Sequence, residues 1–253
     1  MSHPVTIGKT GWFSTIRSDA WWLEPLLVVV GLGLFVIYTT ISAVFLDSHF
    51  EYGPYLSPFY EPLLTFHWWH FSPAILILWV PLAFRTTCYY YRGAYYKAFF
   101  LNPPACAVTG SQTKAYRGES RFPFILMKLH RFTLYLALVL NAFLWWGAIR
   151  SFWYEGHLGI GVGSVVLTIN AYLLMMYSLG CHSLRHLVGG RLDCFSCSRG
   201  SKVRHGLWEK ITFWNENHKK WAWTSLIFVA LTDLYIRLVS WGVIHDFNTW
   251  RGL

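Results

Sequence analysis

Long apolar stretches without charged side chains limit most strongly what this chain can fold into. A helix needs about 20 residues to cross the hydrocarbon core of a bilayer. Five stretches approach or exceed that length, namely Pro25–Phe45, Leu63–Phe84, Phe132–Ile149, Leu158–Leu179 and Trp221–Ile244. The first four contain no Asp, Glu, Lys or Arg. The sequence therefore predicts an all-α integral membrane protein with five transmembrane helices in a bundle.

The overall composition agrees with a lipid environment. Only 13% of the 253 residues are charged, whereas a soluble protein has about 25%. Aromatic residues make up 19% of the chain, and Trp and Tyr favour the interface between membrane and water. The sequence shows no internal repeat, linker or cleavable signal peptide. We expect a single membrane-anchor domain over residues 1–253.

The net charge of +9 is concentrated in two of the connecting segments. The loop 47–62 has three acidic residues and no basic one, whereas segments 85–131 and 180–220 carry eight Lys or Arg residues each. Basic loops remain on the cytoplasmic side of a membrane. The sequence therefore predicts a plasma-membrane protein with a cytoplasmic N-terminus and an external C-terminus. A nucleic-acid partner is not needed to explain the positive charge.

The two basic segments are also long, and loops of such length are usually functional or disordered. They are rich in Tyr, Phe, Trp and Cys, which is a poor composition for disorder. We therefore expect two ordered cytoplasmic segments that form a platform for a partner or a cofactor.

All five cysteines fall in these segments, at positions Cys88, Cys106, Cys181, Cys194 and Cys197. In the run CHSLRHLVGGRLDCFSC, His182 and His186 are four residues apart and share one face of a helix. Gly189 and Gly190 are expected to end that helix. Cys194 and Cys197 then form a C-x-x-C pair, a spacing that lets two thiolates bind one metal.

The predicted metal ligands are therefore His182, His186, Cys194 and Cys197. Zinc accepts two Cys and two His in a structural site. A Rieske-type [2Fe–2S] cluster uses the same four ligand types, although the usual C-x-H and C-x-x-H motifs are absent. Cys88, Cys106 and Cys181 remain alternative ligands, and thiols without any metal are the simplest alternative.

The remaining histidines raise two further hypotheses. Haem b needs two His facing each other from different helices; span one has no His, and His130 with His182 is the conceivable pair. A quinone site is expected at His130, Arg131 and Tyr135, where the third span begins. Binding to lipid phosphate is the alternative role for Arg131. His218 is expected to be solvated.

Asp233 and Arg237 are the only formal charges inside a predicted span. They are four residues apart, so they share a helix face and can pair. We expect an ion pair that fixes helix packing, with a proton path as the alternative. Under the first reading, replacing both residues by Leu recovers much of the stability that a single replacement loses.

Two stretches, FEYGPYLSPFYEPLL and YYYRGAYYKAFFLNPPAC, together with the expected spans, carry a family resemblance. The chain resembles the membrane-anchor subunit of actinobacterial, mycobacterial-type succinate dehydrogenase. The resemblance implies flavoprotein and iron–sulfur partner subunits, menaquinone as the electron acceptor, and a haem-free branch with a Rieske-type cluster in the anchor. A haem b anchor is one competing function. The other is a structural or transport membrane protein whose fold is held together by a structural zinc ion.

Overall fold

The computed structural model describes residues 22–99, 124–190 and 192–250, together with residues 20, 120 and 122. Helices dominate this part of the chain. The helical elements are α1 (Leu23–Thr40), η1 (Ile41–Phe45), α2 (Ile75–Thr86), α3 (Tyr89–Ala98), η3 (Phe124–Leu129), α4 (His130–Arg150), α5 (Val162–Leu179), α6 (His182–Gly189), α7 (Arg199–Glu216) and α8 (His218–Ser240). Two antiparallel hairpins pair β1 (Glu51–Tyr52) with β2 (Tyr55–Leu56), and β3 (Trp153–Tyr154) with β4 (His157–Leu158).

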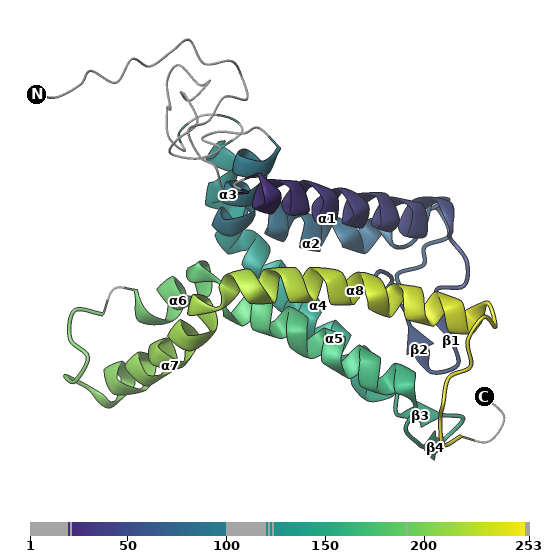
Figure 1. The fold of residues 1–253 in the computed structure, drawn as a ribbon. Coiled ribbons are helices and arrows are strands. Elements are labelled where there is room, and N and C mark those ends of the chain that lie inside the picture. Colours follow the sequence, from purple (N-terminus) through teal and green to yellow (C-terminus); the bar gives the residue numbers. More distant parts are fainter. Residues whose placement is uncertain are drawn as a thin grey trace, which may run out of the picture.

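The helical bundle has different structures at its two ends (Figure 1). We call the end with α3, α6 and α7 the platform end, and the end with the two β-hairpins the hairpin end. Helices α1, α4, α5 and α8 run between these ends (Figure 1), and α2 packs against α4. One buried core cluster, which includes Phe84, Tyr177 and Ala222, lies toward the platform end. Two others, around Tyr55 and around Phe59, lie toward the hairpin end.

Four helical segments of the described residues are long and apolar enough to cross a membrane. These segments are Leu23–Phe45, Ile125–Arg150, Val162–Leu179 and His218–Ser240. They confirm the predicted first, third, fourth and fifth spans, with boundaries shifted by a few residues. The fourth starts later than expected because His157–Leu158 forms strand β4.

The predicted second span, Leu63–Phe84, is wrong in its extent, so the count of five is not confirmed. The only helix in it is α2, and its 12 residues rise about 18 Å, which is less than a hydrocarbon core of roughly 30 Å. The Ser72 Oγ accepts the backbone N–H of Ala74 at 3.3 Å, and Pro73 follows Ser72. Pro73 therefore marks the start of a helix, where it costs no hydrogen bond, and not a kink within one.

The segment that contains α2 still returns the chain to the platform end. Thr87, directly after α2, hydrogen-bonds His130 at the start of α4, and α3 packs against α1. Non-helical residues 63–74 supply the remaining length of this return.

The described residues of the platform end are mostly helical. Helix α6 carries His182 and His186 and ends at Gly189, with Gly190 as its C-cap, which confirms the expected helix and its end. The N-cap of helix α7 is Ser198, whose side chain accepts the backbone N–H of Ser201 in a capping box. Cys106 lies outside the described residues.

Candidate functional site

A Cys or a His stands at each of four junctions between the bundle and the platform end. Cys88 is the N-cap of α3, directly after α2, and Cys181 is the N-cap of α6, directly after α5. Both have an extended backbone that turns the chain between two helices. His130 is the first residue of α4, and His218 is the first residue of α8. We call these four residues the junction cluster.

The junction cluster consists of two contacting Cys–His pairs. The His130 Nε2 lies 3.1 Å from the Cys181 Sγ, and the His218 Nε2 lies 3.5 Å from the Cys88 Sγ. The two pairs also lie close to each other, because His130 is near enough to His218 for an electrostatic interaction between the two imidazoles. Burial and, to a smaller extent, the nearby Cys88 raise the pKa of the Cys181 thiol to about 11.

Aromatic rings pack on both imidazoles and limit the access of water. The Phe84 ring stacks on His130, with centroids 4.8 Å apart and an interplanar angle of 2°. The Tyr177 ring stacks on His218 at 5.0 Å and 17°. Both thiols are almost fully buried, at 3% exposure for Cys88 and 1% for Cys181.

Polar neighbours orient one imidazole and leave the other incompletely bonded. The Thr87 Oγ1 hydrogen-bonds the His130 Nδ1 at 2.9 Å, which turns Nε2 toward Cys181. By contrast, the buried His218 Nδ1 has no hydrogen-bond partner among the described residues. A Cβ added to Gly180 would meet that nitrogen at 3.2 Å and the Trp214 carbonyl at 2.9 Å. Glycine at this position therefore lets the chain pass close to the imidazole.

A cation flanks the junction cluster on the side of α8. The Arg85 guanidinium donates to the Ala222 carbonyl at 3.1 Å and to the Ser225 Oγ at 2.9 Å, and it also donates to the Tyr91 hydroxyl. Its central carbon lies 4.5 Å from the centroid of the Tyr177 ring. Arg85 thus ties α2 to α8 and places a positive charge beside the cluster.

No group of three or more His, Cys, Asp or Glu in the described part of the chain is arranged to hold a metal ion. The junction cluster therefore does not converge on one point as the ligands of a single zinc ion do. Its four donors, two sulfurs and two nitrogens, form two separate sulfur–nitrogen contacts.

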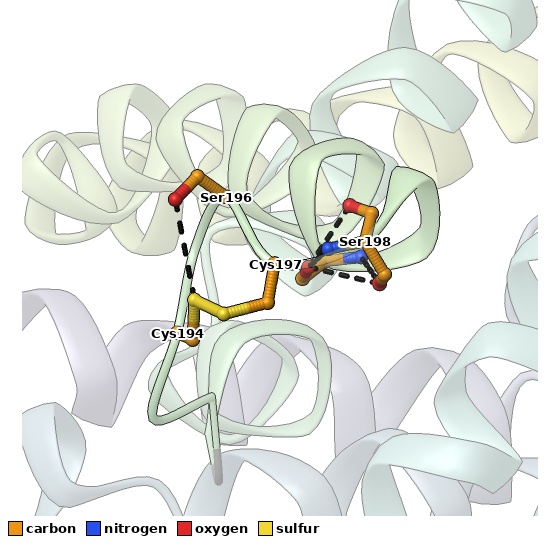
Figure 2. The surroundings of a disulfide bond; sticks show 5 residues. Cys194, Ser196, Cys197 and Ser198 are labelled. Carbon is orange, nitrogen blue, oxygen red and sulfur yellow. Dashed lines mark hydrogen bonds between the residues drawn. A yellow bond between two sulfur atoms is a disulfide. The ribbon is translucent and has the colours of Figure 1, made fainter.

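The four metal ligands expected from the sequence are not brought together. Cys194 and Cys197 are joined in a disulfide (Figure 2), whereas metal coordination requires thiolates. His182 and His186 are exposed on α6. Their expected common helix face is present, but it faces away from the bundle core.

The residues expected to bind a quinone point in different directions. His130 faces the bundle interior and contacts Cys181, while Arg131 and Tyr135 are exposed on the outer face of α4. The structure therefore does not assemble these three residues into one pocket. The expectation of a solvated His218 is wrong, because that ring packs between Tyr177 and Cys88.

This chain is similar to known proteins over most of its length. A family model described as actinobacterial succinate dehydrogenase subunit SdhC matches residues 23–242. The chain belongs to this SdhC family. A search of curated proteins finds no match. A solved structure, the Mycobacterium smegmatis Sdh1 complex in the apo form, contains a chain 40% identical to this SdhC-family chain. The match has a TM-score of 0.86 and covers 96% of this chain and 100% of that chain.

Family membership confirms several expectations from the sequence. The chain is a multi-pass membrane subunit of a succinate dehydrogenase complex, and its fold is that of a helical membrane anchor. The resemblance deduced from FEYGPYLSPFYEPLL and YYYRGAYYKAFFLNPPAC is thereby confirmed.

Proposed function

We propose that this SdhC-family chain carries electrons from its iron–sulfur partner subunit to menaquinone through a Rieske-type [2Fe–2S] centre held by Cys88, Cys181, His130 and His218. The observation that carries the proposal is the junction cluster, with two pairs of sulfur and nitrogen donors at the platform end. This donor set replaces the one expected from the sequence, which was His182, His186, Cys194 and Cys197.

The chemistry of the junction cluster suits a centre with two irons. Each iron of a Rieske-type centre takes only two protein ligands, two Cys on one iron and two His on the other. Four donors of the right types therefore need not all converge on a single metal ion. The unpaired Nδ1 of the buried His218 also leaves one ring nitrogen free for a ligand bond.

The surrounding residues hold these donors and keep water away. Thr87 fixes the orientation of His130 through its Nδ1, and Phe84 and Tyr177 cover the two imidazoles. The positive charge of Arg85 favours added negative charge nearby. When bound, a Rieske-type centre supplies a one-electron relay whose reduction potential its His ligands raise.

The overall reaction balances without chemistry on succinate in this chain. Succinate oxidation in the flavoprotein partner releases two electrons and two protons. Reduction of one menaquinone to its quinol consumes two electrons and two protons. The anchor thus needs an electron relay near its platform end and a place where the quinone ring binds. We place the platform end on the cytoplasmic side because the described residues of the basic segments 85–131 and 180–220 lie there.

Metal and cofactor analysis of the purified complex tests this function. Iron, acid-labile sulfide, zinc and haem are measured on the same sample, and the iron and sulfide of the separated soluble subunits are subtracted. We expect two irons and two sulfides per anchor, as a [2Fe–2S] centre requires. One zinc ion per anchor would support the alternative of a structural zinc site. One haem b per anchor, seen as a b-type band in the absorption spectrum, would support the haem alternative.

A further inference from the structure

We infer that Cys194 and Cys197 form a redox-active site, at which a low-molecular-weight thiol of the cytoplasm reduces the disulfide and the oxidised form of that thiol restores it. The proposed function leaves this C-x-x-C pair without a role, because the junction cluster supplies all four ligands. The inference goes beyond that function and takes from it only the cytoplasmic position of the platform end.

The two cysteines lie in the segment that joins α6 to α7, where a reagent in solution can reach them (Figure 2). They are joined in a disulfide, with their Cα atoms 5.7 Å apart. Cys197 is exposed and Cys194 is half-buried, whereas the free thiols of Cys88 and Cys181 are buried. Thiol–disulfide exchange needs direct access of a thiolate to one of the sulfurs. The C-x-x-C pair meets this condition, and the two buried thiols do not.

The disulfide is not needed to hold α6 against α7. The Arg204 guanidinium of α7 donates to the carbonyls of Val188 and Gly190 at the end of α6, at 2.9 and 3.1 Å. The Arg185 guanidinium of α6 lies over the Trp208 ring of α7, 4.4 Å from its centroid. The disulfide itself joins residues only three positions apart, and a cross-link stabilises a fold less when it closes a short loop. The α6–α7 contact therefore survives when the bond is broken.

The cytoplasmic position also points to reversible chemistry. Cytoplasmic thiols keep most cysteines reduced, and the disulfides that do occur there are usually transient and either catalytic or redox-sensing. Exposed disulfides have higher reduction potentials than buried structural ones and are the more easily reduced. An exposed pair at the platform end is therefore expected to change between disulfide and dithiol.

The charges around the pair favour a reactive thiolate at Cys197. Cys197 directly precedes Ser198, the N-cap of α7, and the first turn of a helix attracts negative charge. Arg199 and Lys202 are exposed in this turn and add positive charge, whereas the acidic Asp193 is next to Cys194 in the chain. Cys197 is thus both the more accessible sulfur and the one with the more positive surroundings.

The exchange balances in two steps. In reduction, an external thiolate attacks the Cys197 Sγ, the disulfide bond breaks, and Cys194 leaves as a thiolate that takes up a proton. A second external thiolate attacks the first external sulfur, forms the external disulfide, and releases Cys197, which takes up the second proton. Two external thiols are thereby oxidised to one disulfide, and two electrons and two protons reach the pair. Oxidation reverses both steps.

Differential alkylation of the purified whole complex tests the inference. The native complex is equilibrated in buffers with different ratios of reduced to oxidised glutathione, quenched with acid, denatured and alkylated with N-ethylmaleimide. Residues 192–199 form one tryptic peptide with both cysteines, because Arg191 and Arg199 mark its ends. Mass spectrometry counts the labels on this peptide. We expect two labels in the most reducing buffer and none in the most oxidising one, whichever state the complex starts from.

Two results would overturn the inference. A disulfide that resists reduced glutathione in the native complex, and is reduced only when the complex is unfolded in the same buffer, would be a structural bond. Two labels in every buffer would mean that the pair does not form a disulfide in the complex. The measurement uses neither iron content nor turnover, so its failure is distinguishable from a failure of the proposed function.

A matched pair of variants tests the assigned order of steps. Cys194→Ser leaves only Cys197 to attack oxidised glutathione, and Cys197→Ser leaves only Cys194. Without a second cysteine to release it, the glutathione stays bound to the peptide. We expect bound glutathione in the Cys194→Ser complex and much less in the Cys197→Ser complex, because Cys194 is half-buried. Equal amounts in both would overturn the role of Cys197, and none in either would overturn the whole inference.

Discussion

The side chains of Asp233 and Arg237, inside the last span, are fully buried, and neighbouring groups bond both of them. The Arg237 Nε lies 3.0 Å from the Asp233 Oδ2, which confirms the pairing expected from their spacing. Asp233 also accepts hydrogen bonds from the hydroxyls of Tyr38, Ser42 and Ser57. Arg237 donates to the carbonyls of Ser42, Leu46 and Ser48. The pair therefore fastens the chain between α1 and β2 to α8.

We predict that Asp233→Asn lowers the stability of the complex by roughly 3–5 kcal/mol, because it leaves a buried guanidinium uncompensated. The thermal unfolding midpoint of the detergent-purified complex measures the loss. Lys219→Ala is the control, since it removes an exposed ion pair with Glu24 that contributes about 1 kcal/mol or less. Equal midpoints for the two variants would contradict a structural role for the buried pair.

The wider network changes the expectation for the double replacement. Asp233→Leu with Arg237→Leu removes both charges but leaves three hydroxyls and three carbonyls without their partners. We therefore expect the double variant to remain about as unstable as the single one. Recovery of stability, the outcome expected from the sequence, would show that the ion pair acts alone.

Residue spacing made part of these sites predictable. Asp233 and Arg237 are neighbours on one helix turn, so their contact follows from the sequence. Tyr38 meets Asp233 across 195 positions and Cys88 meets His218 across 130 positions, and no local pattern specifies such contacts. The C-x-x-C pair had the recognisable spacing, but the buried thiols lie at helix junctions that only the tertiary structure brings together.

At the scale of helices and strands, close packing at the hairpin end explains the position of α5. A Cβ added to Gly163, in the first turn of α5, would meet ring atoms of Tyr55 at 2.5–2.7 Å. Tyr55 is 1% exposed in strand β2, and its hydroxyl donates to the Asp246 carboxylate at 2.7 Å. Gly163 thus lets α5 approach the first hairpin, and the ring has no room to move.

We predict that Gly163→Ala lowers stability by about 1–3 kcal/mol, the usual cost of overpacking a core. Gly33→Ala, in the middle of α1, is the control because no atom lies within 4 Å of the added Cβ. That change should be neutral or stabilising by up to about 1 kcal/mol. Both are measured as shifts in the thermal midpoint of the purified complex, and equal destabilisation would contradict the packing argument.

Hydropathy predicted the long helices but not the short one. The apolar run Leu63–Phe84 reads as one span because a hydropathy window cannot distinguish helical from non-helical apolar residues. In the structure Phe66, Trp68, Trp69 and Phe71 pack on one another without a helix. The sequence Ser72-Pro73 is a helix start signal, and it gives the observed beginning of α2.

For the whole molecule, the charges differ between the two ends of the bundle. The described basic residues of segments 85–131 and 180–220 lie toward the platform end, while Asp47, Glu51 and Asp246 lie toward the hairpin end. In the orientation that we propose, with the basic segments in the cytoplasm, the junction cluster faces the soluble partner subunits. The sequence predicted this distribution correctly, since charge patterning does not depend on exact helix boundaries.

We predict that a reporter active only outside the cell works when fused after Leu253 and fails when inserted after Asp193. The first position follows the hairpin end, and the second lies between α6 and α7 at the platform end. A reporter active only in the cytoplasm serves as the reciprocal control. Activity at Asp193 and none at Leu253 would reverse the proposed orientation.

The central claim is that the junction cluster, and not the C-x-x-C pair, holds the iron–sulfur centre. Electron paramagnetic resonance of the reduced complex tests it with Cys88→Ser, Cys181→Ser and the control Cys194→Ser. Serine is a good N-cap residue, so the helix starts at positions 88 and 181 should survive. We expect the Rieske-type signal to disappear in the first two variants and to persist in Cys194→Ser. A signal that persists in Cys88→Ser and Cys181→Ser but disappears in Cys194→Ser would contradict the account.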